Sequence, residues 1–136
     1  MIEFFCEHIE FQPPNPNELK DWLSSVVRSE DHKLGDTNYI FCDDQYLLKL
    51  NQDYLGHNTY TDIITFDHSE IPQQVSGDIY ISIERVQDNA RKFMTDPQEE
   101  LKRVMVHGLL HLLGYDDQSP EQQQEMRKKE EAYLSL

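Results

Sequence analysis

Two histidines and an aspartate near the end of the chain have the spacing of a metal site. His107 and His111 are four residues apart within an apolar segment, residues 101–113. On a helix this spacing places both imidazoles on one face, one turn apart, where they can bind the same ion. Gly114 permits a sharp turn after them, and Asp117 then follows closely enough to supply a third ligand. The pattern therefore predicts a metal site at the end of a buried helix.

Such a ligand set is typical of a catalytic metal. Two histidines and one carboxylate leave a fourth position open for an attacking water molecule, whereas a structural zinc more often has four protein ligands. The spacing is that of the metzincin proteases, HExxHxxGxxH, but Gly108 stands where those enzymes carry their glutamate base, which argues against peptide hydrolysis. An alternative is that His107 and His111 are ordinary hydrogen-bonded core residues. The turn at Gly114 and the third donor at Asp117 make this alternative less favoured than a metal site.

Size and charge restrict the class of protein. At 136 residues we expect a single domain, residues 1–136. The net charge of −14 excludes broad electrostatic attraction to nucleic acid, so any RNA must be bound locally. No apolar run approaches the roughly 18 residues of a membrane span, and the acidic start is unlike a signal peptide. Cys6 and Cys42 lie in strand-like stretches without a CxxC motif, so we expect buried free thiols and a cytoplasmic location.

The elements that must position the site are predicted from periodicity and capping signals. Alternating or β-branched runs predict four strands, at residues 2–11, 38–42, 61–66 and 78–83, with a loop at 29–36. The short connection between the last two strands favours antiparallel pairing. Cap-and-proline pairs predict helix starts at Asn15-Pro16, Asp96-Pro97 and Ser119-Pro120.

Two further helices complete the prediction. One follows Asp43 or Asp44 and stops at Gly56, and the other covers residues 84–93. The last helix mixes acidic and basic residues, Glu130 among them, as a solvent-exposed face would. The fold class is therefore α+β, with a small mixed sheet and about five helices.

Three segments resemble one known family. HGLLHLLGYDD, residues 107–117, resembles the signature HGxLHLxGYDH of the YbeY family. Residues 50–66, LNQDYLGHNTYTDIITF, are similar to its LNxxYRxKDxPTDVLSF, and residues 77–79 to its GDI. Met126 and Glu130-Glu131 also fit, so the resemblance extends over most of the chain.

This resemblance implies an activity and its components. It implies a single-strand-specific, metal-dependent endoribonuclease that acts in 16S rRNA 3′-end maturation and ribosome quality control, through attack by metal-activated water. It also implies a four-stranded mixed sheet and one Zn²⁺ per chain, held by His107, His111 and Asp117 at the base of a cleft. The expected partners are single-stranded rRNA and the ribosomal subunit, with no membrane and no DNA. The alternative is a non-catalytic ribosome-assembly factor that retains the fold.

Two positions depart from the family pattern. Asp117 replaces its third histidine, which adds a hard oxygen ligand and a negative charge, so another divalent transition metal could bind instead of zinc. Leu55 replaces an arginine suited to clamping phosphate. His57, Thr61 and Asp62 are candidate cleft-lining residues, although His57 could be an ordinary loop residue, and the other two could be turn residues before a strand. The sequence identifies no separate catalytic acid or base.

Overall fold

A four-stranded sheet lies at the centre of the computed structural model, which describes all residues, 1–136. Its strands are ordered β1-β2-β4-β3. Both neighbours of β2 run parallel to it, whereas β3 and β4 are antiparallel. The predicted mixed sheet and its antiparallel pair are therefore confirmed. The strands are β1 (Ile2–Cys6), β2 (Lys33–Cys42), β3 (Ile63–Asp67) and β4 (Gln74–Ser82).

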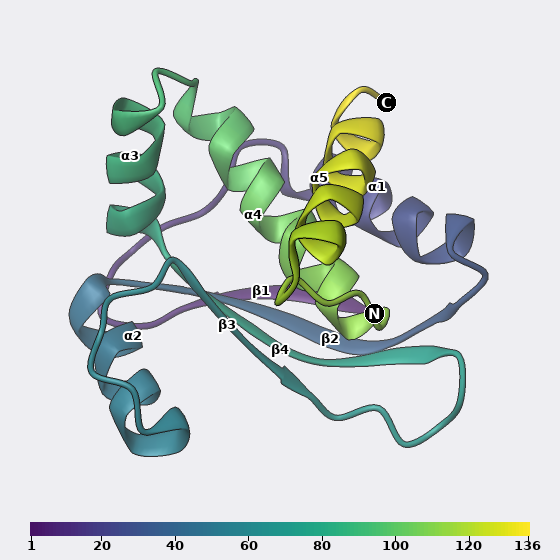
Figure 1. Ribbon diagram of the computed structural model, residues 1–136, viewed down its shortest axis with the longest axis horizontal. Coiled ribbons are helices and arrows are strands. Elements are labelled where there is room, and N and C mark those ends of the chain that lie inside the picture. Colours follow the sequence, from purple (N-terminus) through teal and green to yellow (C-terminus); the bar gives the residue numbers. More distant parts are fainter.

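Five helices surround the sheet, so the predicted α+β class is confirmed. Figure 1 shows α1, α3, α4 and α5 on one side of the sheet and α2 on the other. No helix has the length and apolar composition that crossing a membrane requires. The helices are α1 (Pro16–Ser29), α2 (Asp44–Leu50), α3 (Ile83–Lys92), α4 (Pro97–Leu112) and α5 (Pro120–Leu134).

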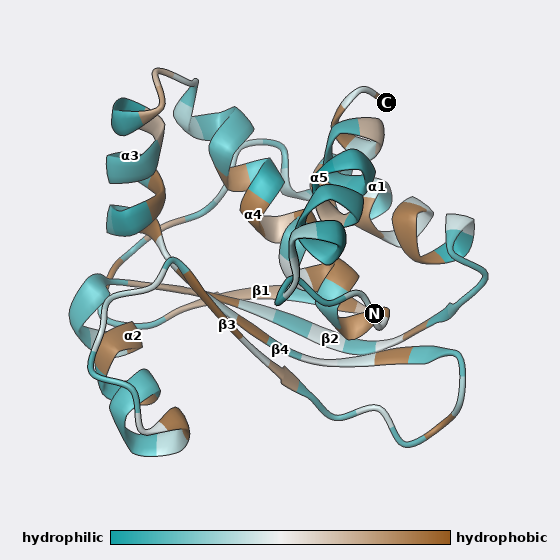
Figure 2. Ribbon diagram, in the orientation of Figure 1, coloured by the Kyte–Doolittle hydropathy of each residue, from teal (hydrophilic) through white to brown (hydrophobic).

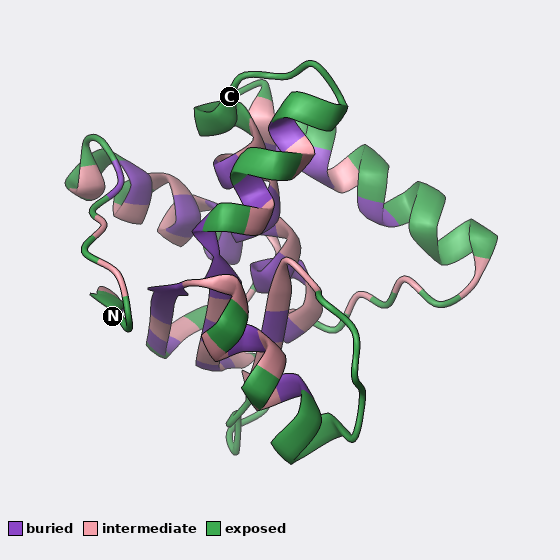
Figure 3. Ribbon diagram, turned by 90° about the vertical axis from the view of Figure 1, so that its left-hand side faces the viewer, coloured by how far each residue is buried: buried purple, intermediate pink, exposed green.

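The main core lies between the sheet and helices α1 and α4. Buried residues gather where the helices meet the strands, and exposed ones cover the outer turns (Figure 3). Helix α4 comes so close to the sheet at Gly108 that an added Cβ would lie 2.7 Å from Ile63 Cδ1 and 2.9 Å from Ile79 Cγ2. This close approach leaves His107 and His111 on a different side of α4, where their side chains are partly exposed.

Several predicted strand limits were wrong. β1 ends at Cys6 rather than residue 11, because His8 has a φ of 68° and the chain leaves the extended conformation. β2 begins at Lys33, within the predicted loop, because β4 pairs with Lys33 and Leu34, and its hydrogen bonds outweigh the low strand propensity of the polar residues there. β1 pairs with β2 only from Thr37 onward. Cys42 is buried as expected, but Cys6 is exposed at the end of an edge strand.

Most predicted helix boundaries have the expected hydrogen bonds. Asp96 accepts from the Gln98 amide at 2.7 Å, and Ser119 forms a capping box with Gln122. Asn15 is the exception, because it adopts a left-handed conformation and its side chain caps nothing. The helix after Asp43 continues from α2 into a π turn, Asn51–Leu55, before it stops at Gly56 as predicted.

A half-buried carboxylate joins three separate parts of the chain next to the predicted site. Glu30, just after α1, accepts hydrogen bonds from the hydroxyls of Tyr115 and Tyr133 and from Lys129 Nζ. Burial raises the pKa of Glu30, but these three hydrogen bonds outweigh that effect, so its pKa lies below the ordinary value. Glu30 thereby ties α5 and the turn after α4 to the end of α1.

Replacing Glu30 with Gln is expected to destabilise the protein by about 1–3 kcal/mol at neutral pH, because the substitution weakens three half-buried hydrogen bonds. The low folded-state pKa means that the contribution of Glu30 is complete above its unfolded-state pKa and is lost as pH falls through the lower folded value. The stability difference, measured by urea unfolding, should therefore shrink below about pH 4.5.

Asp31→Asn is the matched control, because it removes the same charge from the adjacent, exposed residue, where the left-handed backbone (φ 58°) suits asparagine. Equal stability of the two variants at neutral pH would show that the Glu30 contacts contribute nothing.

Candidate metal centre

Helix α4 places His107 and His111 side by side. Capped by Asp96 and started by Pro97, it is buried along most of its length, and the two histidines lie four residues apart on its partly exposed face. Their ring centroids are 4.7 Å apart, and the two Nε2 atoms are 3.1 Å apart. The two imidazoles therefore present one nitrogen each to the same point.

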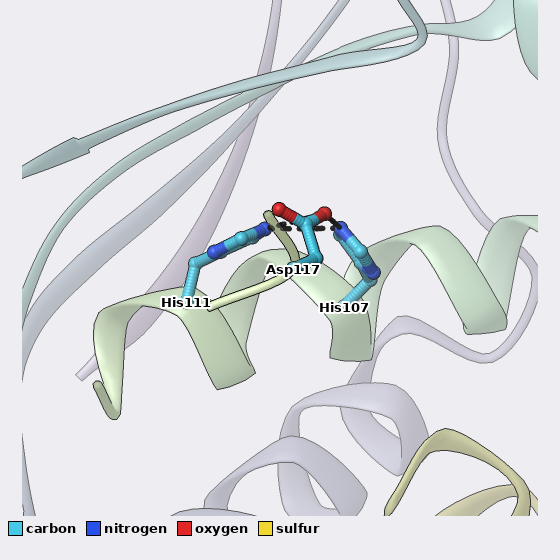
Figure 4. A group of neighbouring side chains, drawn as sticks. All are labelled: His107, His111 and Asp117. Carbon is cyan, nitrogen blue, oxygen red and sulfur yellow. Dashed lines mark hydrogen bonds and ion pairs between the residues drawn. The ribbon is translucent and has the colours of Figure 1, made fainter. Parts of the chain in front are cut away.

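The turn after α4 brings Asp117 to that point. Gly114 has a φ of 106°, and its amide donates to His111 O, while the Tyr115 amide donates to Leu110 O. The chain then reverses, and Asp117 Oδ2 lies 3.4 Å from Nε2 of each histidine. Figure 4 shows the carboxylate between the two rings.

These three atoms have the separations that one tetrahedral ion requires. Metal bonds of about 2.0–2.1 Å at tetrahedral angles place neighbouring ligand atoms about 3.3 Å apart. The observed separations are 3.1, 3.4 and 3.4 Å. His107, His111 and Asp117 could therefore hold a metal ion and leave one position free.

Hydrogen bonds on the far side of each ring set the tautomers. His107 Nδ1 lies 2.6 Å from Glu130 Oε2, and His111 Nδ1 lies 3.1 Å from the Tyr115 carbonyl oxygen. A carboxylate oxygen and a carbonyl oxygen accept hydrogen bonds but cannot donate them. In a neutral ring, the single N–H must therefore be at Nδ1. Each Nε2 then directs a lone pair toward the other and toward Asp117, an arrangement that favours a cation between them.

The negative charges around His107 also favour a cation at the site. Burial lowers the pKa of His107, but the hydrogen bond and negative charge of Glu130, with the charges of Asp117 and Asp62, outweigh it and raise the pKa. The site therefore attracts positive charge, whether that charge is a proton or a metal ion.

A cavity of about 290 Å³ opens beside the cluster. Burial raises the pKa of Asp62 in its wall, and the charge of His107 only partly opposes this effect. Arg103 is the only lysine or arginine among its lining residues, which are Asp62, Ile63, Arg103, Val104, His107 and Asp117. The cavity thus combines two of the three clustered donors with a carboxyl group and a guanidinium.

The other candidate residues lie next to this cavity. Thr61 and His57 line a second hollow of about 400 Å³, which shares Ile63 with the first. Leu55 also lines this second hollow and is 48% exposed. A larger hollow of about 570 Å³ beside α2 shares no lining residue with either.

The structure reveals two residues that sequence reasoning missed. Glu130 was expected on a solvated face, but it is buried and contacts both His107 and Arg103. Arg103 precedes His107 by four residues, so the helical periodicity that identified His111 also places Arg103 on the same face. In α5, helical spacing puts Glu130 on the same face as Met126 and Tyr133, whereas Glu131 lies off that face, so periodicity could have indicated that Glu130 is buried. Its contact with His107 depends on tertiary packing.

Comparisons with known proteins agree with the motif resemblance. The family model described as Endoribonuclease YbeY matches residues 4–136. A curated relative named Endoribonuclease YbeY, from Flavobacterium psychrophilum, is 51% identical over 136 residues, which is 100% of this chain and 96% of the relative. Another of the same name, from Amoebophilus asiaticus, is 49% identical over 133 residues, 98% of this chain and 90% of the relative.

A solved structure with a similar fold also matches this chain. The solution structure of TM1509 from Thermotoga maritima matches with a TM-score of 0.70 and 30% identity, over 99% of this chain and 87% of that one. Family model, relatives and fold each match almost the full length of the chain, and on this evidence the protein belongs to the YbeY family.

Proposed function

We propose that this chain is a metal-dependent endoribonuclease that cleaves single-stranded RNA in the cavity beside His107. The observation that carries the proposal is the placement of three donor atoms, 3.1–3.4 Å apart, next to a cavity with a guanidinium and a second carboxyl group. The relatives named Endoribonuclease YbeY support RNA as the substrate.

The proposed cofactor is one Zn²⁺ ion held by His107, His111 and Asp117. Imidazole nitrogen and carboxylate oxygen suit zinc, and the ligand separations suit tetrahedral geometry. The oxygen of Asp117 also suits other divalent transition metals, so manganese or iron could replace zinc. When bound there, the ion supplies Lewis-acid activation of the water that attacks the phosphodiester bond.

The remaining cavity residues act on the RNA itself. Arg103 uses Nη1 to bind Glu130 and can offer its remaining guanidinium donors to the phosphate, a role that the neutral, exposed Leu55 cannot fill. Asp62 has a raised pKa, so it holds a proton at higher pH than an exposed aspartate and can donate it to the leaving ribose oxygen. Thr61 and His57 line the adjacent hollow, and we expect them to contact the neighbouring nucleotide.

The proposed biological substrate is the 3′ end of 16S rRNA within the ribosomal subunit, with a role in ribosome quality control. This substrate implies action in the cytoplasm. We propose that residues 1–136 form one domain, because the sheet and helices α1, α4 and α5 all contribute to one main core.

Peptide hydrolysis is not supported by the packing of α4. A glutamate at position 108 would enter the contact with Ile63 and Ile79 rather than face the histidines. A second candidate function is a ribosome-assembly factor that binds RNA or ribosomal protein without cleavage. Leu55, in place of a phosphate-binding arginine, favours the absence of cleavage, and the net charge of −14 favours a protein partner over RNA.

The metal ligands are tested by elemental analysis of gently purified protein. The wild type should hold about one metal ion per chain, and His111→Ala and Asp117→Ala should each lose most of it, because two donors bind far more weakly than three. His68→Ala, which removes an exposed histidine outside the cluster, should keep it. Metal retained by both ligand variants after dialysis would place the ion elsewhere.

Cleavage is tested with purified single-stranded RNA. The wild type should cut it, a chelator should abolish cutting, and added metal should restore it. His111→Ala should be inactive under all three conditions. Cleavage that survives both the chelator and His111→Ala would contradict the proposal, whereas metal binding without any cleavage would favour the assembly-factor alternative.

The role of Asp62 is tested by Asp62→Asn. We expect kcat to fall about 10²–10⁴-fold, the range for loss of a general acid, while metal content stays unchanged. We expect the rate of the wild type to fall as pH rises and Asp62 loses its proton, and this fall should be absent in Asp62→Asn, because the deprotonating group is gone. Ser69→Ala, on the exposed connection after β3, serves as the control. An unaltered pH profile in Asp62→Asn would remove Asp62 from proton transfer.

A further inference from the structure

A buried carboxylate from the last helix contacts the outer nitrogen of one proposed ligand. Glu130 Oε2 lies 2.6 Å from His107 Nδ1, and Glu130 Oε1 accepts from Arg103 Nη1 at 3.0 Å. The Glu130 side chain is only 9% exposed. We propose that Glu130 is a positioning residue, which fixes the ring and tautomer of His107 for metal binding. This inference rests on the metal site of the proposed function.

Glu130 fixes the tautomer of His107 because the hydrogen bond between them can run in only one direction. A carboxylate accepts but cannot donate, so the Nδ1 of His107 must carry the hydrogen and Nε2 keeps its lone pair. The bond also restrains rotation of the imidazole about its link to the helix. Ligand histidines in metal sites generally make such a contact, and a carboxylate partner increases the basicity of the ring.

The two proposed histidine ligands are held in different ways. His111 donates to the neutral Tyr115 carbonyl, on the turn that leads to Asp117. His107 donates to a charged group on a helix that supplies no ligand. Removing the Glu130 charge should therefore affect His107 and leave His111 as an internal reference.

The composition of α5 argues that Glu130 has more than a packing role. Figure 2 shows α5 as hydrophilic over most of its length, and the buried residues of this helix are Met126, Glu130 and Tyr133. An apolar residue in place of a buried ion-paired glutamate is often neutral or stabilising. Stability alone gives no reason for a carboxylate at this position, whereas the contact with His107 does.

Arg103 keeps the carboxylate in place. It precedes His107 by four residues on α4, so its guanidinium reaches Glu130 from the same helix face. Because Arg103 occupies Oε1, the other oxygen, Oε2, is directed to the imidazole. The pair thus brings a buried negative charge to His107 without leaving it uncompensated.

The test compares Glu130→Gln with Glu131→Gln. Both remove one negative charge from adjacent residues of α5, but Glu131 is exposed. Zn²⁺ affinity is measured by competition with a chromophoric chelator, and the imidazole nitrogen shifts of metal-free protein are measured by NMR at a pH where the rings are neutral. Glu130→Gln should weaken Zn²⁺ binding about 10- to 100-fold. His107 should lose its pure Nδ1–H tautomer while His111 keeps it, and Glu131→Gln should match the wild type.

Near-UV circular dichroism verifies folding, and Glu130→Asp, which restores the charge, should recover part of the affinity if Glu130→Gln folds poorly. Equal Zn²⁺ affinity and unchanged His107 shifts in Glu130→Gln and Glu131→Gln would overturn the inference. If the wild type binds no metal, the site assignment fails, and with it the proposed role in metal binding; the NMR comparison would still show whether Glu130 sets the His107 tautomer.

Discussion

Two imidazole lone pairs and a carboxylate oxygen repel one another at close range unless a proton or a metal ion lies among them. The structure places His107 Nε2, His111 Nε2 and Asp117 Oδ2 within 3.4 Å of one another. In water these groups would repel each other or turn away, so the fold must hold them together. The surrounding structure holds these three atoms close together despite their repulsion, and a bound metal ion would turn that repulsion into attraction.

The support comes from elements far apart in the sequence. The sheet holds α4 in place where Gly108 contacts it, and Gly114 reverses the chain so that Asp117 faces the histidines. Glu30 ties the turn to α1 and α5 through Tyr115. Helix α5 supplies no ligand. It restrains the turn after α4 through the bonds of Lys129 and Tyr133 to Glu30, and it contacts His107 through Glu130. Preorganisation of this kind lowers the entropy lost when an ion binds.

Much of the site follows from short-range pattern, because its ligands lie within eleven residues. The helical interval between His107 and His111 and the turn at Gly114 are local features, so the sequence alone predicted the cluster that the structure brings together. The fold class followed similarly from periodicity and from caps such as Asp96.

What the sequence did not predict depends on tertiary contacts. The central strand begins at Lys33 because β4 pairs with its first residues, and the burial of Glu130 depends on how α5 packs against α4. Cys6 proved exposed because its strand lies at the sheet edge. The strand pairing and the contact of Glu130 with His107 join residues far apart in the sequence, so local propensity could not reveal them.

Anomalous X-ray diffraction from crystals of the zinc-loaded protein tests the central claim most directly. We predict one anomalous peak per chain, about 2.0–2.2 Å from His107 Nε2, His111 Nε2 and an oxygen of Asp117. A peak that lacks Asp117 as a ligand, or that lies at another group of acidic residues, would contradict it.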